Sequence, residues 1–307
     1  MRRRVPTRRI SSHFNAPRAN TFDIRDELRP GSYTRTIAHM DRNVSLVVSF
    51  DGTKFHGFQT QPGLRTVQET LETSIRRAVR HHVTLLGSGR TDAGVHAAGH
   101  VSNFHTTCEL ESRRLAHSIG SRLPKDLSIV ALRDVKPEFR ATCSATSKLY
   151  RYRIFNARRR PVGRLSQRYV YHYWEPLDVD AMRAGAKHFV GEMDYSAMAA
   201  SGTKRASMVR EVLRCVIERH RDEIRIDVEG TGFLWKQVRT MVGTLLDVGR
   251  GRWTPHHIAT ILSSRDRRQA GPTVPARGLC LRWVRYPSRF FCDEQKMPPA
   301  VTDGDPR

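Results

Sequence analysis

The sequence predicts an α+β protein in which two α/β subdomains share a central, mostly antiparallel sheet flanked by helices. Apolar residues alternate with other residues along short segments of both halves, which is typical of strands. They recur every third or fourth residue along longer segments, which is typical of helices. Neither a Gly-x-Gly-x-x-Gly turn after the first strand nor a Walker loop occurs, so the sequence disfavours a nucleotide-binding fold.

The first half opens with a strand over residues 44–50, where apolar side chains alternate. Thr66-Val67-Gln68-Glu69 has the pattern of a capping box and predicts the start of a helix, because apolar residues then recur at every fourth position. A short apolar stretch over 83–86 follows, and the next expected helix covers 112–123.

The second half begins with a strand in which Tyr150, Tyr152 and Ile154 share one face, because side chains alternate along a strand. Asp178 is expected to cap a helix, and Thr254-Pro255 predicts the start of another. The remaining expected elements are a long helix over 234–245 and strands over 212–217, 224–228 and 279–286.

The two ends of the chain differ from this pattern. Residues 1–40 carry nine arginines, three acids and no hydrophobic period, so we expect a disordered basic arm. A transit peptide for an organelle, an arm that adds RNA affinity, and a true start at Met40 are alternative interpretations. We divide the rest into a subdomain over 41–147, a second over 148–287, and a disordered tail over 288–307.

Charge and cysteine usage restrict the partners. The 307 residues include 53 Lys and Arg against 30 Asp and Glu, a net charge of +23, which attracts polyanions and favours nucleic acid as the partner. No apolar run approaches the roughly 18–20 residues that cross a bilayer. The five cysteines never form a Cys-x-x-Cys pair, which argues against a disulfide framework or a zinc site and fits a reducing compartment.

Three histidines raise the question of a metal site. His96, His100 and His105 are close in sequence, but glycines at 94 and 99 argue against the helix that would align the first two. No nearby Cys or Glu completes a ligand set, so we expect no metal.

The stretch over 87–97, Gly-Ser-Gly-Arg-Thr-Asp-Ala-Gly-Val-His-Ala, is the most informative in the chain. Glycine allows close-approach and left-handed backbone conformations. Arg90 offers a donor fork beside Asp92, which we expect to be ionised. The loop follows the apolar stretch over 83–86, so Asp92 is expected just past the end of a strand, where ligands are commonly met. Taken alone, the same residues also fit a tight loop with a solvated Arg/Asp pair.

Seven blocks of sequence, in order, resemble the tRNA pseudouridine synthase A family. They are Phe50-Asp51-Gly52-Thr53, Gly57-Phe58-Gln59, Gly89-Arg90-Thr91-Asp92-Ala93-Gly94-Val95-His96-Ala97, Lys148-Leu149-Tyr150-Arg151-Tyr152, Gly191-Glu192-Met193-Asp194-Tyr195, Phe233 through Val238-Arg239 to Gly243, and Gly278-Leu279. The blocks extend from about 43 to 286, and the one around Asp92 is highly specific. Phe58 is a mild departure, because the family more often has Trp or Tyr there.

The resemblance implies the pseudouridine synthase fold and the isomerisation of uridine to pseudouridine at positions 38, 39 and 40 of the tRNA anticodon stem-loop. It implies a homodimer that binds tRNA without a cofactor or metal, and we expect it in the cytoplasm. A carboxylate can serve this reaction as a nucleophile or by stabilising positive charge at C1′. A synthase of the same fold acting on another RNA and a non-catalytic RNA-binding protein are the alternatives.

The resemblance also implies three catalytic roles. Asp92 is the nucleophile, with a loop cap as its alternative role. Arg239, on the long second-half helix, is the cation that holds it, and the cost of a buried ion pair argues for a functional reason. Tyr150 would lie against the uracil ring, although an ordinary half-buried tyrosine would give the same strand pattern.

Four further residues are implied in substrate binding. Arg90 would occupy the space of the extruded base, because chemistry on a stacked base requires flipping it out. Leu281 would form a wall of the pocket or pack in the core. Lys148 and Arg151 would contact RNA phosphates.

Overall fold

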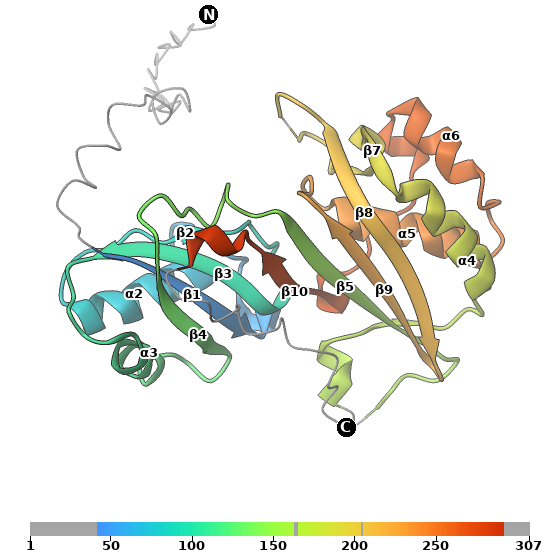
Figure 1. Ribbon diagram of the computed structural model, residues 1–307. Helices are drawn as coiled ribbons and strands as arrows, with labels where there is room; N and C mark the ends of the chain where they lie inside the picture. Colours follow the sequence, from blue (N-terminus) through green and yellow to red (C-terminus); the bar gives the residue numbers. More distant parts are fainter. Residues whose placement is uncertain (1–41, 163–164, 204, 292–307) are drawn as a thin grey trace, which may run out of the picture. The chain divides into compact units, whose positions relative to one another are not determined.

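The computed structural model describes residues 42–162, 165–203 and 205–291 (Figure 1). The predictions for the arm over 1–40 and for residues 292–307 therefore lie outside the described residues. Within the described part, no helix is both long and apolar enough to cross a membrane.

Ten strands form one sheet in the order β4-β1-β3-β10-β5-β9-β8-β7, with β2 added to β3 and β6 added to β5 (Figure 1). Neighbouring strands pair antiparallel except β10 with β3 and β5 with β6. The strands are β1 Arg42–Phe50, β2 Leu86–Gly87, β3 His96–Thr106, β4 Leu127–Val135, β5 Ser147–Asn156, β6 Tyr171–Tyr173, β7 Gly191–Asp194, β8 Val209–His220, β9 Glu223–Gly230 and β10 Leu279–Arg285.

Helices flank both halves of this sheet. Helices α2 and α3 lie beside β1, β3 and β4, and α4, α5 and α6 lie beside β7, β8 and β9 (Figure 1). The α-helices are α2 Val67–Val79, α3 Ser112–Gly120, α4 Val179–Ala186, α5 Gln237–Gly249 and α6 His257–Ser264. Short 3₁₀ helices cover Gly52–Lys54, Leu165–Arg168, Lys187–Phe189, Ser196–Met198, Arg267–Gln269, Ala276–Gly278 and Ser288–Phe290. The predicted α+β class with a mostly antiparallel sheet is confirmed.

Two hydrophobic cores meet at β10, the last strand of the chain. One core packs α4, α5 and α6 on the face of β5 that carries Tyr152 and Ile154. The other packs α2 and α3 on β1 and β3. Leu279 belongs to the first core, whereas Leu281 and Val284 belong to the second. Since β10 lies between β3 and β5, it joins the two halves of the sheet.

The expected capping box at the start of α2 is wrong. Thr66 is the N-cap residue, but its side chain makes no capping hydrogen bond, and its hydroxyl is buried without a partner. The first amides of α2 are instead bonded by backbone carbonyls, because Val67 N–H donates to Gly57 O at 3.2 Å and Gln68 N–H donates to Phe58 O at 2.9 Å. The backbone carbonyls of residues 57 and 58 thus satisfy the first amides of α2 in place of the Thr66 hydroxyl.

Three other helix boundaries differ from prediction. Helix α5 covers Gln237–Gly249 rather than 234–245, so Leu234 precedes it. Helix α3 ends at Gly120 rather than at 123, because Pro124 disfavours a helical residue before it and the chain closes with a tighter turn from Leu123 N–H to Gly120 O. Helix α6 begins at His257, not at Thr254-Pro255, whose carbonyls instead accept the first amides in a preceding turn. The predicted cap at Asp178 is confirmed by its bonds to two backbone amides of α4 at 2.9 Å.

Strands β3, β4, β6 and β7 were not predicted. Strand β3 is buried on both faces and paired on both edges, so its sequence shows no alternation of polar and apolar residues. Its Asn103 is satisfied inside the protein by Asn43 and by the backbone amide of Ala141. The apolar stretch over 83–86 contributes only its last residue to a strand, β2.

The expected disordered tail over 288–307 is wrong at its start. Residues 288–290 form a short 3₁₀ helix, and Phe291 makes a β-bridge with Val135. The cause is aromatic packing, since the rings of Phe290 and Phe291 lie 5.7 and 6.2 Å from that of Phe139.

Gly243 lets α5 lie directly against the segment over 271–274. A Cβ on Gly243 would stand 1.7 Å from the carbonyl oxygen of Pro272. We expect Gly243→Ala to lower the free energy of unfolding by about 1–3 kcal/mol, because the helix and the segment must separate. Urea unfolding measures this, with Gly120→Ala as the control, since a Cβ on Gly120 meets nothing within 4 Å. Equal stability of the two variants would contradict the expectation.

Candidate active site

The loop that carries Asp92 runs from the end of β2 to the start of β3. It turns through a bond from Val95 N–H to Asp92 O at 3.1 Å, with Gly94 in the left-handed region at φ +78°. Two glycines of the preceding blocks lie against this turn. A Cβ on Gly52 would stand 2.0 Å from Val95 O, and one on Gly57 would stand 2.6 Å from Thr91 O. The Phe50–Gln59 region therefore supports the loop by backbone contact that only glycine permits.

Two side chains hold the loop from the opposite direction. Lys148, on β5, donates from Nζ to Ser88 O at 2.5 Å, and His100, on β3, bonds Gly89 O through Nε2 at 2.9 Å. Since a carbonyl can only accept, Nε2 of His100 carries the proton. The imidazole stacks on Phe58 with ring centroids 4.1 Å apart, so the departure from the family's usual residue keeps an aromatic partner for His100.

The structure brings Asp92 and Arg239 together. Nη1 of Arg239, on α5, donates to Oδ2 of Asp92 at 2.7 Å, and the exposed fractions of the two side chains are 13% for Arg239 and 22% for Asp92. The guanidinium is itself oriented by a bond from Nε to Val274 O at 2.8 Å. The ion pair is therefore fixed on its protein side while one edge of the carboxylate remains open to solvent.

Sequence reasoning missed Trp235. Its indole Nε1 donates to Oδ1 of Asp92 at 3.0 Å, and 52% of the residue is exposed. Both oxygens of Asp92 thus accept a hydrogen bond from the short segment 235–239. The signal available in the sequence was a tryptophan inside the block from Phe233 to Gly243, but its contact with Asp92 could not be read from spacing.

Tyr150 lies on β5 between Leu281 of β10 and Val228 of β9. Its ring meets that of Phe233 edge to face, with centroids 5.4 Å apart. Burial, with the charge of Asp92 as a second cause, raises the pKa of Tyr150, so its phenol keeps its proton at neutral pH. Leu281 is buried to 1% exposure among the residues of the second core.

The three basic residues that are predicted to contact RNA lie in different surroundings. Arg90 is exposed beside Asp92. Lys148 is engaged by the loop, and burial lowers its pKa. Arg151 points to the opposite face of β5 from Tyr150, where its Nε and Nη2 bond Asp227 at 2.7 and 2.8 Å. Their contacts with RNA stay predictions.

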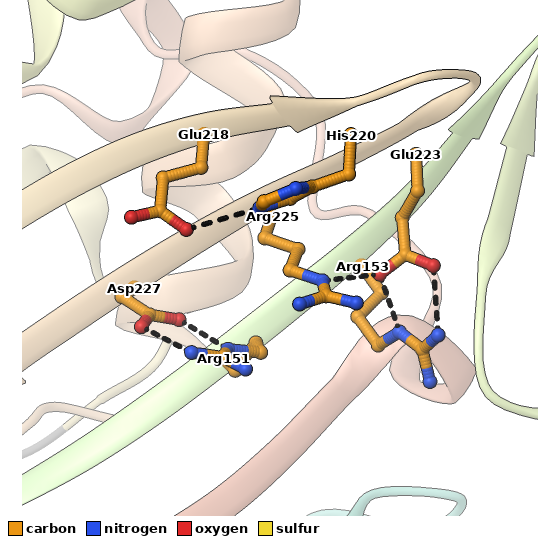
Figure 2. A network of polar contacts seen from close by, with 7 residues as sticks. All are labelled: Arg151, Arg153, Glu218, His220, Glu223, Arg225 and Asp227. Carbon is orange, nitrogen blue, oxygen red and sulfur yellow. Dashed lines mark hydrogen bonds and ion pairs between the residues drawn. The ribbon is translucent and has the colours of Figure 1, made fainter. Parts of the chain in front are cut away.

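Figure 2 shows that Arg151 is one member of a charged array across β5, β8 and β9. Glu223 accepts from both Arg153 and Arg225, and His220 contacts Glu218. Arg151 and Asp227 are direct register partners, and opposite charges at such positions stabilise a sheet. On this face, ion pairs therefore add to the backbone pairing of β5 with β9.

The described ranges contain no group of three His, Cys, Asp or Glu placed to hold a metal ion. His96 has other partners, since Gly52 N–H donates to its Nδ1 at 3.0 Å and its Nε2 lies 3.2 Å from Arg168 O. Burial lowers the pKa of His96.

Comparison with known proteins assigns the family. The profile of the family described as tRNA pseudouridine synthase matches residues 46–142 and 186–287. The chain is 39% identical to tRNA pseudouridine synthase A 2 of Clostridium perfringens over 245 residues, which are 80% of this chain and all of that protein. It is 43% identical to tRNA pseudouridine synthase A of Pelobacter propionicus over 246 residues, with the same shares covered. The chain belongs to the tRNA pseudouridine synthase family.

Among solved structures, the archaeal box H/ACA sRNP Nop10-Cbf5 complex aligns with a TM-score of 0.31 at 12% identity, over 74% of this chain and 60% of that one. The family itself confirms the predicted pseudouridine synthase fold.

His100 makes the site sensitive to acid. Burial lowers its pKa to about 4, so the folded state binds fewer protons at this site than the unfolded state, whose histidine has a pKa of about 6.5. The free energy of unfolding is therefore unaffected by protonation of His100 above pH 6.5. It decreases as the pH falls from 6.5 toward 4, because the unfolded state takes up a proton that the folded state does not. Between pH 7 and pH 4.5 we expect a loss of about 2 kcal/mol from this group.

Urea unfolding at the two pH values measures the loss. His100→Gln is expected to lose about 2 kcal/mol less than the unsubstituted chain over the same interval, because glutamine does not titrate. His220→Gln, at an exposed position, should keep the full dependence. The same pH dependence in His100→Gln would contradict the burial of a neutral imidazole behind the loop.

Proposed function

We propose that the chain isomerises uridine to pseudouridine in tRNA, at positions 38, 39 and 40 of the anticodon stem-loop. The observation that supports this most directly is the contact of Asp92 with Arg239, in a chain that belongs to the tRNA pseudouridine synthase family. The relatives that match along their whole length are named tRNA pseudouridine synthase A, which favours tRNA over another RNA as substrate.

The reaction moves one bond and one proton. The bond from C1′ to N1 breaks, the uracil turns, a bond from C1′ to C5 forms, and the proton of C5 is lost while N1 gains one. Asp92 is the proposed nucleophile, and its carboxylate can bond to C1′ or stabilise the positive charge that develops there. The ion pair with Arg239 aims the carboxylate before substrate arrives, so no reorganisation is needed during the reaction.

The surrounding side chains suit a displaced base. The ring of Tyr150, which feels the charge of Asp92 and packs edge to face on Phe233, offers apolar surface, and its protonated phenol can donate a hydrogen bond to a uracil oxygen. Arg90 is exposed and precedes Asp92 in the same loop, so its side chain can enter the space left by the flipped base. The surplus of 53 Lys and Arg over 30 acids supports binding to the phosphate backbone.

We further propose that the protein is a homodimer of the cytoplasm. The homodimer rests on the resemblance to the family. The cytoplasmic location is supported by the cysteines, since Cys108, Cys143, Cys215 and Cys280 are free thiols, as in a reducing compartment.

Asp92→Asn and Asp92→Ala are expected to reduce pseudouridine formation by at least about 10³-fold, as when a nucleophile is removed, while the affinity for tRNA changes little. The measurement is pseudouridine mapping of an unmodified tRNA transcript, with RNA binding measured in parallel. Asp180→Asn, at an exposed acid of α4, is the control and should keep full activity. Normal pseudouridine formation by Asp92→Ala would refute the proposed mechanism.

The same mapping tests the substrate. Pseudouridine confined to positions 38, 39 and 40 supports the proposal. Modification elsewhere in tRNA, or only in another class of RNA, would replace it with the alternative of a synthase for a different target. RNA binding without any pseudouridine would favour the non-catalytic alternative.

A further inference from the structure

Trp235 combines three properties that a structural tryptophan does not need. It is large and apolar yet 52% exposed, it lies in the loop between β9 and α5, and its single polar atom is bonded to Asp92. The other exposed tryptophan among the described residues, Trp174, has no such contact with the carboxylate. Burial of apolar surface therefore does not explain the position of the Trp235 ring.

The backbone around Trp235 is fixed, so any movement belongs to the ring. The carbonyl of Trp235 accepts from Ala200 N–H at 2.9 Å, and Gln237 accepts from Leu234 N–H at 2.8 Å. Lys236 follows in the left-handed region at φ 59°, which a non-glycine residue adopts at a cost. This strained residue aims the preceding side chain at Asp92 and starts the helix that carries Arg239.

The indole N–H of Trp235 donates a hydrogen bond to one of the two oxygens of the Asp92 carboxylate. Oδ2 is held by Arg239, and Oδ1 is held by the indole. An oxygen that accepts a hydrogen bond is a weaker nucleophile, so the bond from the indole lowers the reactivity of Oδ1. The contact to Arg239 can persist during the reaction, since it lies on the protein side, but the contact to Trp235 lies on the exposed side.

The exposed ring suits one ligand, an unpaired nucleobase. Aromatic side chains in proteins that bind single-stranded or unstacked RNA provide a face on which a base stacks. Lys236 Nζ lies over one face of the Trp235 ring, 4.6 Å from its centre, so a positive charge that attracts RNA phosphates stands beside the ring. Nearer the carboxylate, the ring of Tyr150 feels the charge of Asp92 and packs edge to face on Phe233.

We propose that Trp235 covers Asp92 in the free protein and, when RNA binds, exchanges its hydrogen bond with Oδ1 for stacking on a base of the anticodon loop. The exchange frees Oδ1 for C1′ only when RNA is present. This inference rests on the proposed function. It assigns Trp235 a role in binding the RNA and in exposing the carboxylate, distinct from the bond-making role of Asp92.

The kinetic test separates stacking from chemistry. Trp235→Ala is expected to raise KM for an anticodon stem-loop RNA about tenfold, as loss of one base–aromatic stack does, with the single-turnover rate at saturating enzyme within about threefold of the unsubstituted chain. Trp235→Phe keeps a stacking ring without the N–H and should recover KM to within about threefold. Trp174→Phe is the matched control and should change neither value.

The spectroscopic test follows the ring directly. Stacking on a base quenches indole fluorescence, so the same stem-loop RNA should quench the unsubstituted chain and Trp174→Phe. The quench attributable to Trp235 should be absent in Trp235→Phe. The titration is done in the Asp92→Asn background, so that no turnover occurs.

Three results would overturn the inference: an unchanged KM in Trp235→Ala, a loss of saturated rate without a change in KM, or a full RNA-dependent quench in Trp235→Phe. The unsubstituted chain is assayed for pseudouridine in the same experiment. If it forms none, the proposed function fails. If it forms pseudouridine and the tryptophan variants behave like Trp174→Phe, only the role of Trp235 fails.

Discussion

The ion pair between Asp92 and Arg239 is the interaction on which the proposed chemistry depends. Its partners are 147 residues apart, on the loop before β3 and on α5. They meet because β10, the last strand of the chain, inserts between β3 and β5 and joins the two halves of the sheet. Removing one partner of such a pair would leave the other charge partly buried without compensation, which is costly. Both groups therefore have to be held in place by the surrounding structure.

Hydrogen bonds to backbone carbonyls, together with close contacts at glycines, position the loop of Asp92 and the side chain of Arg239. On one side, His100 and Lys148 hold the carbonyls of residues 88 and 89, and the glycines at 52 and 57 admit the loop. On the other side, Arg239 is oriented by Val274 O, and the segment over 271–274 touches α5 at Gly243. The blocks around Gly52, Gly57, Lys148 and Arg239 therefore all contribute contacts that place Asp92.

The sequence predicted the fold class and strands β1, β5, β8, β9 and β10, because alternation is a local signal, and its motifs pointed to Asp92 and Arg239, which the structure brings together. It missed β3, since a strand buried on both faces shows no alternation, and it assigned a side-chain cap to α2 that the loop over 57–58 replaces. Trp235 was missed for a similar reason. Its bond to Asp92 joins residues 143 positions apart, and no spacing within either segment encodes it.

The most direct test of the central claim is the single-turnover rate of Arg239→Met on a tRNA transcript at saturating enzyme, with RNA affinity and melting temperature measured for the same variant. If Arg239 aims the carboxylate, the rate should fall by about 10²-fold or more, as when one preorganised donor is removed, while RNA affinity stays within a few-fold. Arg239→Lys, which keeps the charge but not the fork, should recover part of the rate. A folded Arg239→Met variant that forms pseudouridine at the full rate would contradict the account.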